Sequence, residues 1–290
     1  MLARARTTRD RPARRPTRRT ALRDLRVLRG QCGFTVLFGP ALAEGTRLTT
    51  LFWDIDGTLL TTGKAGVPAW EAAVKAVTGC DFELSSIRVP GMTDFQIAVR
   101  TFEMLNLDAD DATMRRMVRL YEEGLPAALP LKQGRVLTNV REILEHLEGR
   151  DDVRSYLLTG NTRGGAKAKL THYDLFKYFP DGAFAEDTSD RATIAMRALD
   201  LARRAGPVAE ARLFVIGDTP HDIHCANAIG ARTIAVATGG YSTEELAEHG
   251  PWRVIEALPP PQEFVALIGL SPEPRIRNGG SRLPQPGFTA

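Results

Sequence analysis

The chain has 290 residues, of which 43% are hydrophobic and 25% are charged, a composition typical of a globular protein. It contains no run of about 18 apolar residues, so we expect no membrane-spanning helix. Three widely spaced cysteines form neither a disulfide framework nor a CxxC metal site, which favours a reducing, cytoplasmic setting.

The net charge of +3 is unevenly distributed. Residues 1–47 contain twelve arginines against three acidic residues, a net charge of +9, so the rest of the chain carries −6. This basic arm could be a tail for nucleic acid or another acidic surface, a targeting peptide, or a disordered extension. The segment "RARTTRDRPARRPTRR" has no apolar period and no aromatic residue, so we expect a disordered arm and no nucleic-acid partner.

The first predicted element after the arm is a buried strand over residues 48–53, an apolar, β-favouring run that ends at acidic residues and Gly57. The pattern then becomes helical. Amphipathic helices are expected over 68–77, 95–105 and 112–121, with no convincing buried strand among them. We call residues 65–135 the cap.

Strands and helices alternate in the rest of the chain. We expect helices over 140–147, 163–175, 191–204, 220–229 and 243–248, and strands over 153–158, 182–185, and from 211 and 232 onward. This alternation predicts a Rossmann-like α/β core, a parallel sheet with helices on both faces, formed by residues 48–64 and 136–270. The cap is inserted after the first strand. Residues 271–290 are rich in Pro and Gly and are expected to be a disordered tail.

Polar residues follow three of the predicted strands. They lie in "DIDGT" (Asp54, Asp56), "LLTGN" (Thr159, Asn161) and "GDTPHD" (Asp218, Asp222). Because the carboxyl ends of parallel strands meet at one edge of a sheet, these groups are expected to lie together. Clustering of the carboxylates of Asp54, Asp56 and Asp218 would favour a hard divalent cation such as Mg²⁺, which would in turn attract a phosphate group. One carboxylate could then attack phosphorus while a second exchanges the proton.

The three segments, in this order and with a helical insertion between the first two, resemble the motifs of the haloacid dehalogenase (HAD) superfamily with a type 1 helical cap. The resemblance covers roughly residues 48–258. It implies that Asp54 is the nucleophile that forms an aspartyl-phosphate, and that Asp56 is the general acid and base. The metal would be held by Asp54, Asp218 and the backbone carbonyl of Asp56.

The same resemblance implies supporting roles for other residues. Asp222 would support the metal site indirectly or through water, and Thr159 and Asn161 would hold the phosphoryl group. The third family motif supplies a cation, usually lysine, and comes shortly before the fourth motif, which is "GDTPHD" here. Here the candidate is Arg191, whose planar guanidinium suits phosphoryl oxygens, and Arg197 and Lys169 are weaker candidates.

Two further groups have less specific patterns. In the cap region "GKAG" and "PGMTD" resemble segments of phosphoglycolate-phosphatase-like members, so Lys64 and Thr93 could read the part of the substrate beyond the phosphate. His221 and His224 are three residues apart and could bind a transition metal, although exposure on a helix is the simpler interpretation.

The expected function is a Mg²⁺-dependent phosphatase that hydrolyses a small phosphorylated metabolite, perhaps a phosphoglycolate-like acid. An acid at position 56 favours phosphoryl transfer over dehalogenation, because the resemblance implies that dehalogenases lack it. Two alternatives remain open. One is a phosphomutase of the β-phosphoglucomutase kind, and the other is a basic-armed nucleic-acid-associated protein or 5′-phosphate processor. The oligomeric state is left open.

Overall fold

The computed structural model describes residues 48–186 and 190–273, so the predicted arm and most of the predicted tail lie outside the described residues. Six parallel strands form a sheet in the order β5-β4-β1-β6-β7-β8. The strands are β1 (Thr49–Trp53), β4 (Val153–Leu158), β5 (Gly182–Ala183), β6 (Leu213–Gly217), β7 (Arg232–Val236) and β8 (Arg253–Ile255). The predicted parallel α/β core is therefore confirmed.

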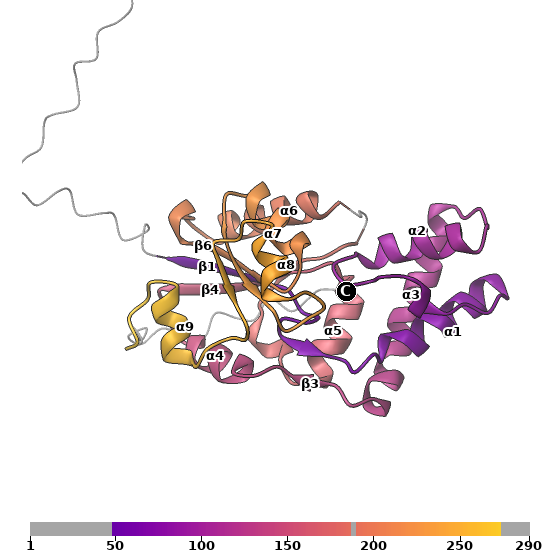
Figure 1. The fold of residues 1–290 in the computed structure, drawn as a ribbon, viewed down its shortest axis with the longest axis horizontal. Coiled ribbons are helices and arrows are strands. Elements are labelled where there is room, and N and C mark those ends of the chain that lie inside the picture. The colour runs from indigo at the N-terminus through magenta and orange to yellow at the C-terminus, as the bar shows by residue number, and fades with distance from the viewer. Residues whose placement is uncertain (1–47, 187–189, 274–290) are drawn as a thin grey trace, which may run out of the picture. The chain divides into compact units, whose positions relative to one another are not determined.

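The central strand β1 is buried along its whole length and pairs with β4 on one side and β6 on the other. Its side chains alternate between the two faces of the sheet. Leu51 and Trp53 pack with α4 (Val140–Leu147), α5 (Arg163–His172) and α9 (Pro261–Leu267), whereas Phe52 packs with α6 (Arg191–Arg204) and α7 (Pro220–Ala228). Figure 1 shows α6 and α7 on one side of the strands and α4 and α9 on the other.

The cap consists of α1 (Gly66–Thr78), α2 (Asp94–Met104) and α3 (Asp111–Ala128), which lie between β1 and β4 in the sequence and gather at one end of the fold in Figure 1. These helices share a hydrophobic cluster of their own. Trp70 lies at its centre, where its Nε1 donates to Thr101 Oγ1 at 3.2 Å and its ring meets Tyr121 edge to face. The cap therefore has its own packed interior.

The chain enters and leaves the cap through two short strands, β2 (Leu60–Thr61) and β3 (Arg135–Val136). They pair antiparallel, with Leu60 opposite Val136 and Thr61 opposite Arg135. Gly134 lies beside this ladder, where a Cβ atom would approach the Thr61 carbonyl oxygen to 2.4 Å. The two connections between core and cap are thus held side by side.

Some element boundaries differ from those expected. Helix α3 does not end at Tyr121 but continues through Pro126, because its last turn still buries Leu125 and Ala128. Helix α5 ends at His172 rather than residue 175, since Asp174 takes a left-handed conformation with φ of 53°. The strands β2, β3 and β8 and the helix α9 had not been predicted. In the part of the chain that the structure describes, no helix has the length and apolar character needed to cross a membrane.

Candidate active site

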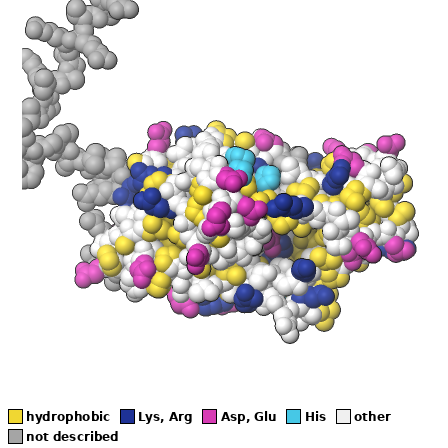
Figure 2. Space-filling model, viewed as in Figure 1, with side chains coloured by type: hydrophobic (Ala, Val, Ile, Leu, Met, Phe, Trp, Pro, Cys, Tyr) yellow, Lys and Arg dark blue, Asp and Glu magenta, His cyan; other side chains and the backbone are white. Residues whose placement is uncertain are grey.

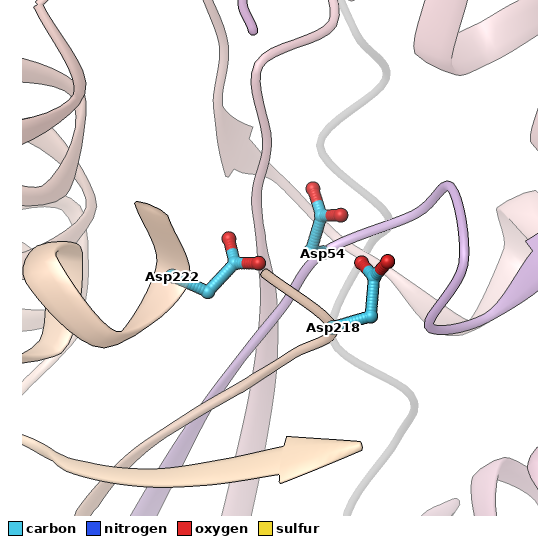
Figure 3. Close-up of side chains that lie close together, drawn as sticks. All are labelled: Asp54, Asp218 and Asp222. Atoms are coloured by element: carbon cyan, nitrogen blue, oxygen red, sulfur yellow. The ribbon is translucent and has the colours of Figure 1, made fainter. Parts of the chain in front are cut away.

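Asp54 follows the last residue of β1 and lies at the point where the strand order reverses. Its backbone N–H donates to the Ile216 carbonyl at 3.0 Å, which extends the pairing with β6. The residue is only 7% exposed. One carboxylate oxygen each from Asp54, Asp218 and Asp222 lies within 4.8 Å of the others, and Figure 3 shows the three side chains converging. The close group thus contains Asp222 in place of Asp56, the third member that the sequence led us to expect beside Asp54 and Asp218.

Asp218 comes directly after β6 and is packed tightly between two glycines. Gly57 has φ of +82°, and a Cβ atom there would lie 2.3 Å from Asp218 Oδ2. At Gly239, after β7, the same distance would be 1.6 Å. Any side chain at either position would displace the carboxylate. Gly239 was not singled out from the sequence, although it lies in the "ATGG" that follows a predicted strand.

Asp222 lies in the first turn of α7, and both of its carboxylate oxygens have partners. Oδ2 accepts from the Thr219 backbone N–H at 3.1 Å and from the Thr219 hydroxyl at 2.7 Å. Oδ1 accepts from Arg191 in a buried ion pair. Because these bonds occupy Asp222, Asp54 and Asp218 are better placed to offer oxygens to a ligand.

Arg191 is the first residue of α6 and is 8% exposed. One of its terminal nitrogens pairs with Asp222, and the other lies close to the loop after β4, where a Cβ atom on Gly160 would be 2.7 Å from it. Its Nε is buried and, among the described residues, has no hydrogen-bond partner. A buried donor without a partner is costly unless a ligand satisfies it. Arg191 thus has the chemistry of an anion-binding residue at this site.

Thr159 and Asn161 lie on the loop that follows β4. Thr159 is fully buried, and its hydroxyl oxygen accepts from Asn161 Nδ2 at 2.8 Å. Asn161 Nδ2 also donates to Asp56 Oδ2 at 2.9 Å. Lys169 of α5 donates from Nζ to Asp56 Oδ2 at 2.5 Å and to Asn161 Oδ1 at 2.6 Å. The structure therefore places a second buried cation at the site, on the Asp56 side.

The sequence named Lys169 only as a weaker candidate for the cation of the third motif. A stronger signal was available in the spacing of α5, whose buried residues Gly165, Ala166, Lys169 and Leu170 follow a helical period. A lysine on the apolar face of a helix that starts beside a motif loop is rarely buried without a partner. Arg197, the other weak candidate, is exposed.

The segment before α2 lies directly on the core. Asp94 donates from its backbone N–H to the Gly160 carbonyl at 3.0 Å, and its Oδ2 accepts from the Thr162 N–H at 2.8 Å. Gly91 lies against His221, where a Cβ atom would be 2.3 Å from the imidazole. The cap thus covers the loop that carries Thr159 and Asn161.

The two cap-side candidates occupy different environments. Thr93 is fully buried and caps α2, since its hydroxyl accepts from the Gln96 N–H at 3.1 Å while Gln96 Oε1 accepts from the Thr93 N–H at 2.9 Å. Lys64 is exposed and has φ of 66° on the connection from β2 to α1. A role for either residue in reading the substrate stays a prediction.

His221 and His224 do not join the carboxylate cluster. Among the described residues, the group of acidic, His and Cys side chains close enough to share a metal ion consists of Asp54, Asp218 and Asp222. The His224 ring packs edge to face against His249 at 5.7 Å between centroids. Figure 2 shows histidine side chains reaching the surface where α7 and α8 (Thr243–Ala247) lie. The structure favours the simpler interpretation of these histidines.

The electrostatics of the carboxylate cluster fit a hard divalent cation. Burial, followed by the charge of Asp222, raises the pKa of Asp54 to about 7, although Arg191 and a hydrogen bond from Thr159 act in the opposite direction. Burial and the charge of Asp54 raise the pKa of Asp218 well above its usual range. Crowded, buried oxygen donors with this preference for protonation are stabilised in their charged form by a bound cation.

Because of the raised pKa of Asp54, we expect Mg²⁺ to stabilise the protein more at pH 8 than at pH 5. In the metal-free folded protein the protonated form of the Asp54 carboxyl is favoured. The free-energy cost of ionising this buried carboxyl is therefore absent below pH 4 and grows as the pH rises to about 7. For Asp54 it reaches on the order of 4 kcal/mol. Melting midpoints of chelator-treated protein with and without Mg²⁺ at both pH values measure this effect. KCl of equal ionic strength is the control, and an equal shift at pH 5 and pH 8 would contradict the expectation.

Comparison with known proteins agrees with this fold. The family profile described as HAD-hydrolase-like matches residues 193–260. "Putative pyrophosphatase PpaX" of Caldanaerobacter subterraneus is 23% identical over 213 residues, which cover 72% of this chain and 91% of that protein. "Probable phosphatase IndB" of Dickeya dadantii is 27% identical over 229 residues, covering 77% and 96%. The crystal structure of CbbY from Rhodobacter sphaeroides in complex with phosphate superimposes with a TM-score of 0.59 at 17% identity, covering 72% of this chain and 94% of that one.

The fold and these matches show that the chain is similar to HAD-type hydrolases, and the family profile itself matches the part that carries α6, β6, α7 and β7. Both relatives carry phosphatase or pyrophosphatase names, which agrees with the resemblance of the motifs.

Proposed function

We propose that the protein is a Mg²⁺-dependent phosphatase that hydrolyses a small phosphomonoester through an aspartyl-phosphate on Asp54. The observation that carries the proposal is the meeting of two kinds of group at the carboxyl ends of β1, β4 and β6. Three buried carboxylates lie together, and buried Arg191 adjoins them with an unpartnered Nε. Carboxylates alone would repel a phosphate, whereas a cation site beside an arginine attracts one.

A small substrate is favoured by the position of the cap. The Met92–Asp94 segment contacts the loop after β4, through the Asp94 bonds to Gly160 and Thr162. A cap that lies on this loop restricts access to the site, which favours a small substrate over a polymer end. The resemblance of the cap segments to phosphoglycolate-phosphatase-like proteins suggests an acidic metabolite, and a cytoplasmic location remains the expectation from the cysteine pattern.

In the proposed reaction, a carboxylate oxygen of Asp54 attacks phosphorus while the bond between phosphorus and the leaving oxygen breaks. Asp56 gives its proton to the departing alkoxide. Asp56 then takes a proton from the water that attacks the aspartyl-phosphate, which releases inorganic phosphate and restores Asp54. Arg191 and Thr159 hold the phosphoryl oxygens through N–H and O–H donors.

Asp54, Asp218 and the backbone carbonyl of Asp56 would hold the metal ion. When bound, Mg²⁺ supplies positive charge that offsets the repulsion between the substrate's phosphate and the carboxylates. Asp222 contributes by fixing Arg191 and Thr219, to which both of its oxygens are bonded.

A panel of phosphate esters tests this function on purified protein. It includes an aryl phosphate, phosphoglycolate, several sugar phosphates and pyrophosphate, with phosphate release as the measurement. We expect turnover of at least one monoester, and a loss of about 100-fold or more after chelation that added Mg²⁺ reverses. Conversion of a sugar phosphate into its isomer without phosphate release would indicate the mutase instead. No turnover of any ester with Mg²⁺ present would overturn the proposal.

A further inference from the structure

Lys169 is held in an arrangement that involves Asp56 rather than the nucleophile Asp54. Its side chain is 7% exposed, whereas that of Asp56 is 43% exposed. Lys169 Nζ donates to Asp56 Oδ2 and to Asn161 Oδ1, and Asn161 Nδ2 donates to the same Asp56 oxygen. These three bonds close a ring. In a ring of this kind, the position of each side chain is fixed by the other two.

The two buried cations of the site are divided between different acids. Arg191 pairs with Asp222 on α7, whereas Lys169 reaches Asp56 from α5, which packs on the opposite face of the sheet from α6 and α7. Burial by itself lowers the pKa of Lys169, but the charge of Asp56, together with Tyr121 and Asp94 of the cap, raises it above its usual value. The contacts of Lys169 Nζ are thus with Asp56 and Asn161, on the side of the site away from the Arg191–Asp222 pair.

The bonds to Asp56 are made on one side of its carboxylate. In the described part of the chain, the side-chain donors Lys169 and Asn161 both bond Oδ2. The other oxygen, Oδ1, is left to exchange a proton. Because the Asp56 side chain is nearly half exposed, burial does not fix its rotamer, and these bonds must do so.

We propose that Lys169 is a positioning residue that holds Asp56 by Oδ2 so that Oδ1 can protonate the leaving oxygen. The inference rests on the proposed phosphatase function. It assigns to α5 a residue whose role differs from that of the phosphate-binding cation Arg191. Proton transfer by a well-placed acid contributes about 10²- to 10⁴-fold to a rate, and much of this is lost when the acid is free to rotate.

A comparison of leaving groups separates this role from a structural one. An alkyl phosphate leaves as a strongly basic alkoxide and needs the acid, whereas 4-nitrophenyl phosphate leaves as a stabilised phenolate and needs it little. For Lys169→Met we expect kcat/KM to fall at least about 10-fold more for the alkyl ester than for the aryl ester. kcat/KM is the appropriate quantity because it reports the steps up to departure of the leaving group.

Lys167→Met is the matched control, because Lys167 lies on the same helix and is exposed. Lys167→Met should leave the ratio of kcat/KM for the alkyl ester to kcat/KM for the aryl ester unchanged. Lys169→Gln, which keeps one donor toward Asp56, should show a smaller change in the ratio than Lys169→Met. It also serves as the second variant if Lys169→Met folds poorly by circular dichroism.

A double mutant provides the decisive step. Asp56→Asn alone should lower kcat/KM more for the alkyl ester than for the aryl ester. Adding Lys169→Met to Asp56→Asn should not change the ratio of the two kcat/KM values further, because the residue at position 56 can no longer donate a proton. Equal loss on both esters in Lys169→Met, or a further change of ratio in the double mutant, would overturn the positioning role while leaving the phosphatase proposal standing. Inactivity of the wild-type protein on both esters and on the wider panel would instead overturn the phosphatase function, and the inference with it.

Discussion

Asp54→Asn is expected to lower Mg²⁺-dependent hydrolysis of an aryl phosphate by about 10⁴-fold or more. An amide oxygen cannot form the aspartyl-phosphate, and covalent catalysis is lost together with one of the predicted metal ligands. The substitution is nearly isosteric and removes one of three crowded negative charges, so the fold should be kept. Steady-state phosphate release measures the loss.

Two controls make this result specific to the chemistry. The melting midpoint of chelator-treated Asp54→Asn at pH 8 should be equal to that of the wild-type protein or higher, because burial and the charge of Asp222 raise the pKa of Asp54, and a neutral amide avoids both costs. Mass spectrometry of acid-quenched protein should find one added phosphoryl group on the wild-type chain and none on the variant. Activity retained within 10-fold would rule out Asp54 as the nucleophile.

Arg191→Met should lower the free energy of unfolding by about 3–5 kcal/mol, because it leaves Asp222 as a buried carboxylate without its cation. Asp222 is 1% exposed and Arg191 is 8% exposed, so neither can recover solvation from water. The variant should also bind phosphate more weakly, since the unpartnered Nε is lost with the guanidinium. Urea unfolding and inhibition by inorganic phosphate measure the two effects.

Arg203→Met provides the control on the same helix. Arg203 pairs with Asp200 three residues away, but both side chains are more than half exposed, so this substitution should cost less than 1 kcal/mol. The double variant Arg191→Met/Asp222→Asn should regain part of the lost stability, because the remaining buried charge is removed as well. If Arg191→Met is no less stable than Arg203→Met, the buried pair contributes no more to stability than the exposed one.

The parts of the fold that the sequence predicted correctly are those with a strong local pattern. The run "LFW" before Asp54 is entirely apolar and occupies the centre of the sheet. Both faces of this strand are buried, so its sequence is a continuous apolar run without alternating polar residues. The short strands β2, β3 and β8 gave no such pattern. Pairing between residues 60–61 and 135–136 depends on contacts across more than 70 residues of chain, which no local window contains.

The site was predictable to the extent that it lies at strand ends. Asp54, Thr159 and Asp218 follow three parallel strands, so topology alone brings them to one edge. The placement of Lys169 could not be deduced in the same way. It reaches the site from the second turn of a helix, and its partner Asp56 is 113 residues away in the sequence. Its role depends on helix rotation and side-chain length, which strand order does not determine.

The paired strands β2 and β3 have a consequence for how such a protein can diversify. Because Leu60 and Val136 lie opposite each other, the 75 residues between them begin and end at almost the same point in space. A segment with adjoining ends can be lengthened, shortened or exchanged without moving the strands that carry Asp54 and Asp218. Under the proposed function, an engineered chimera joined at this ladder should therefore keep the reaction of its core while taking its choice of substrate from the inserted cap.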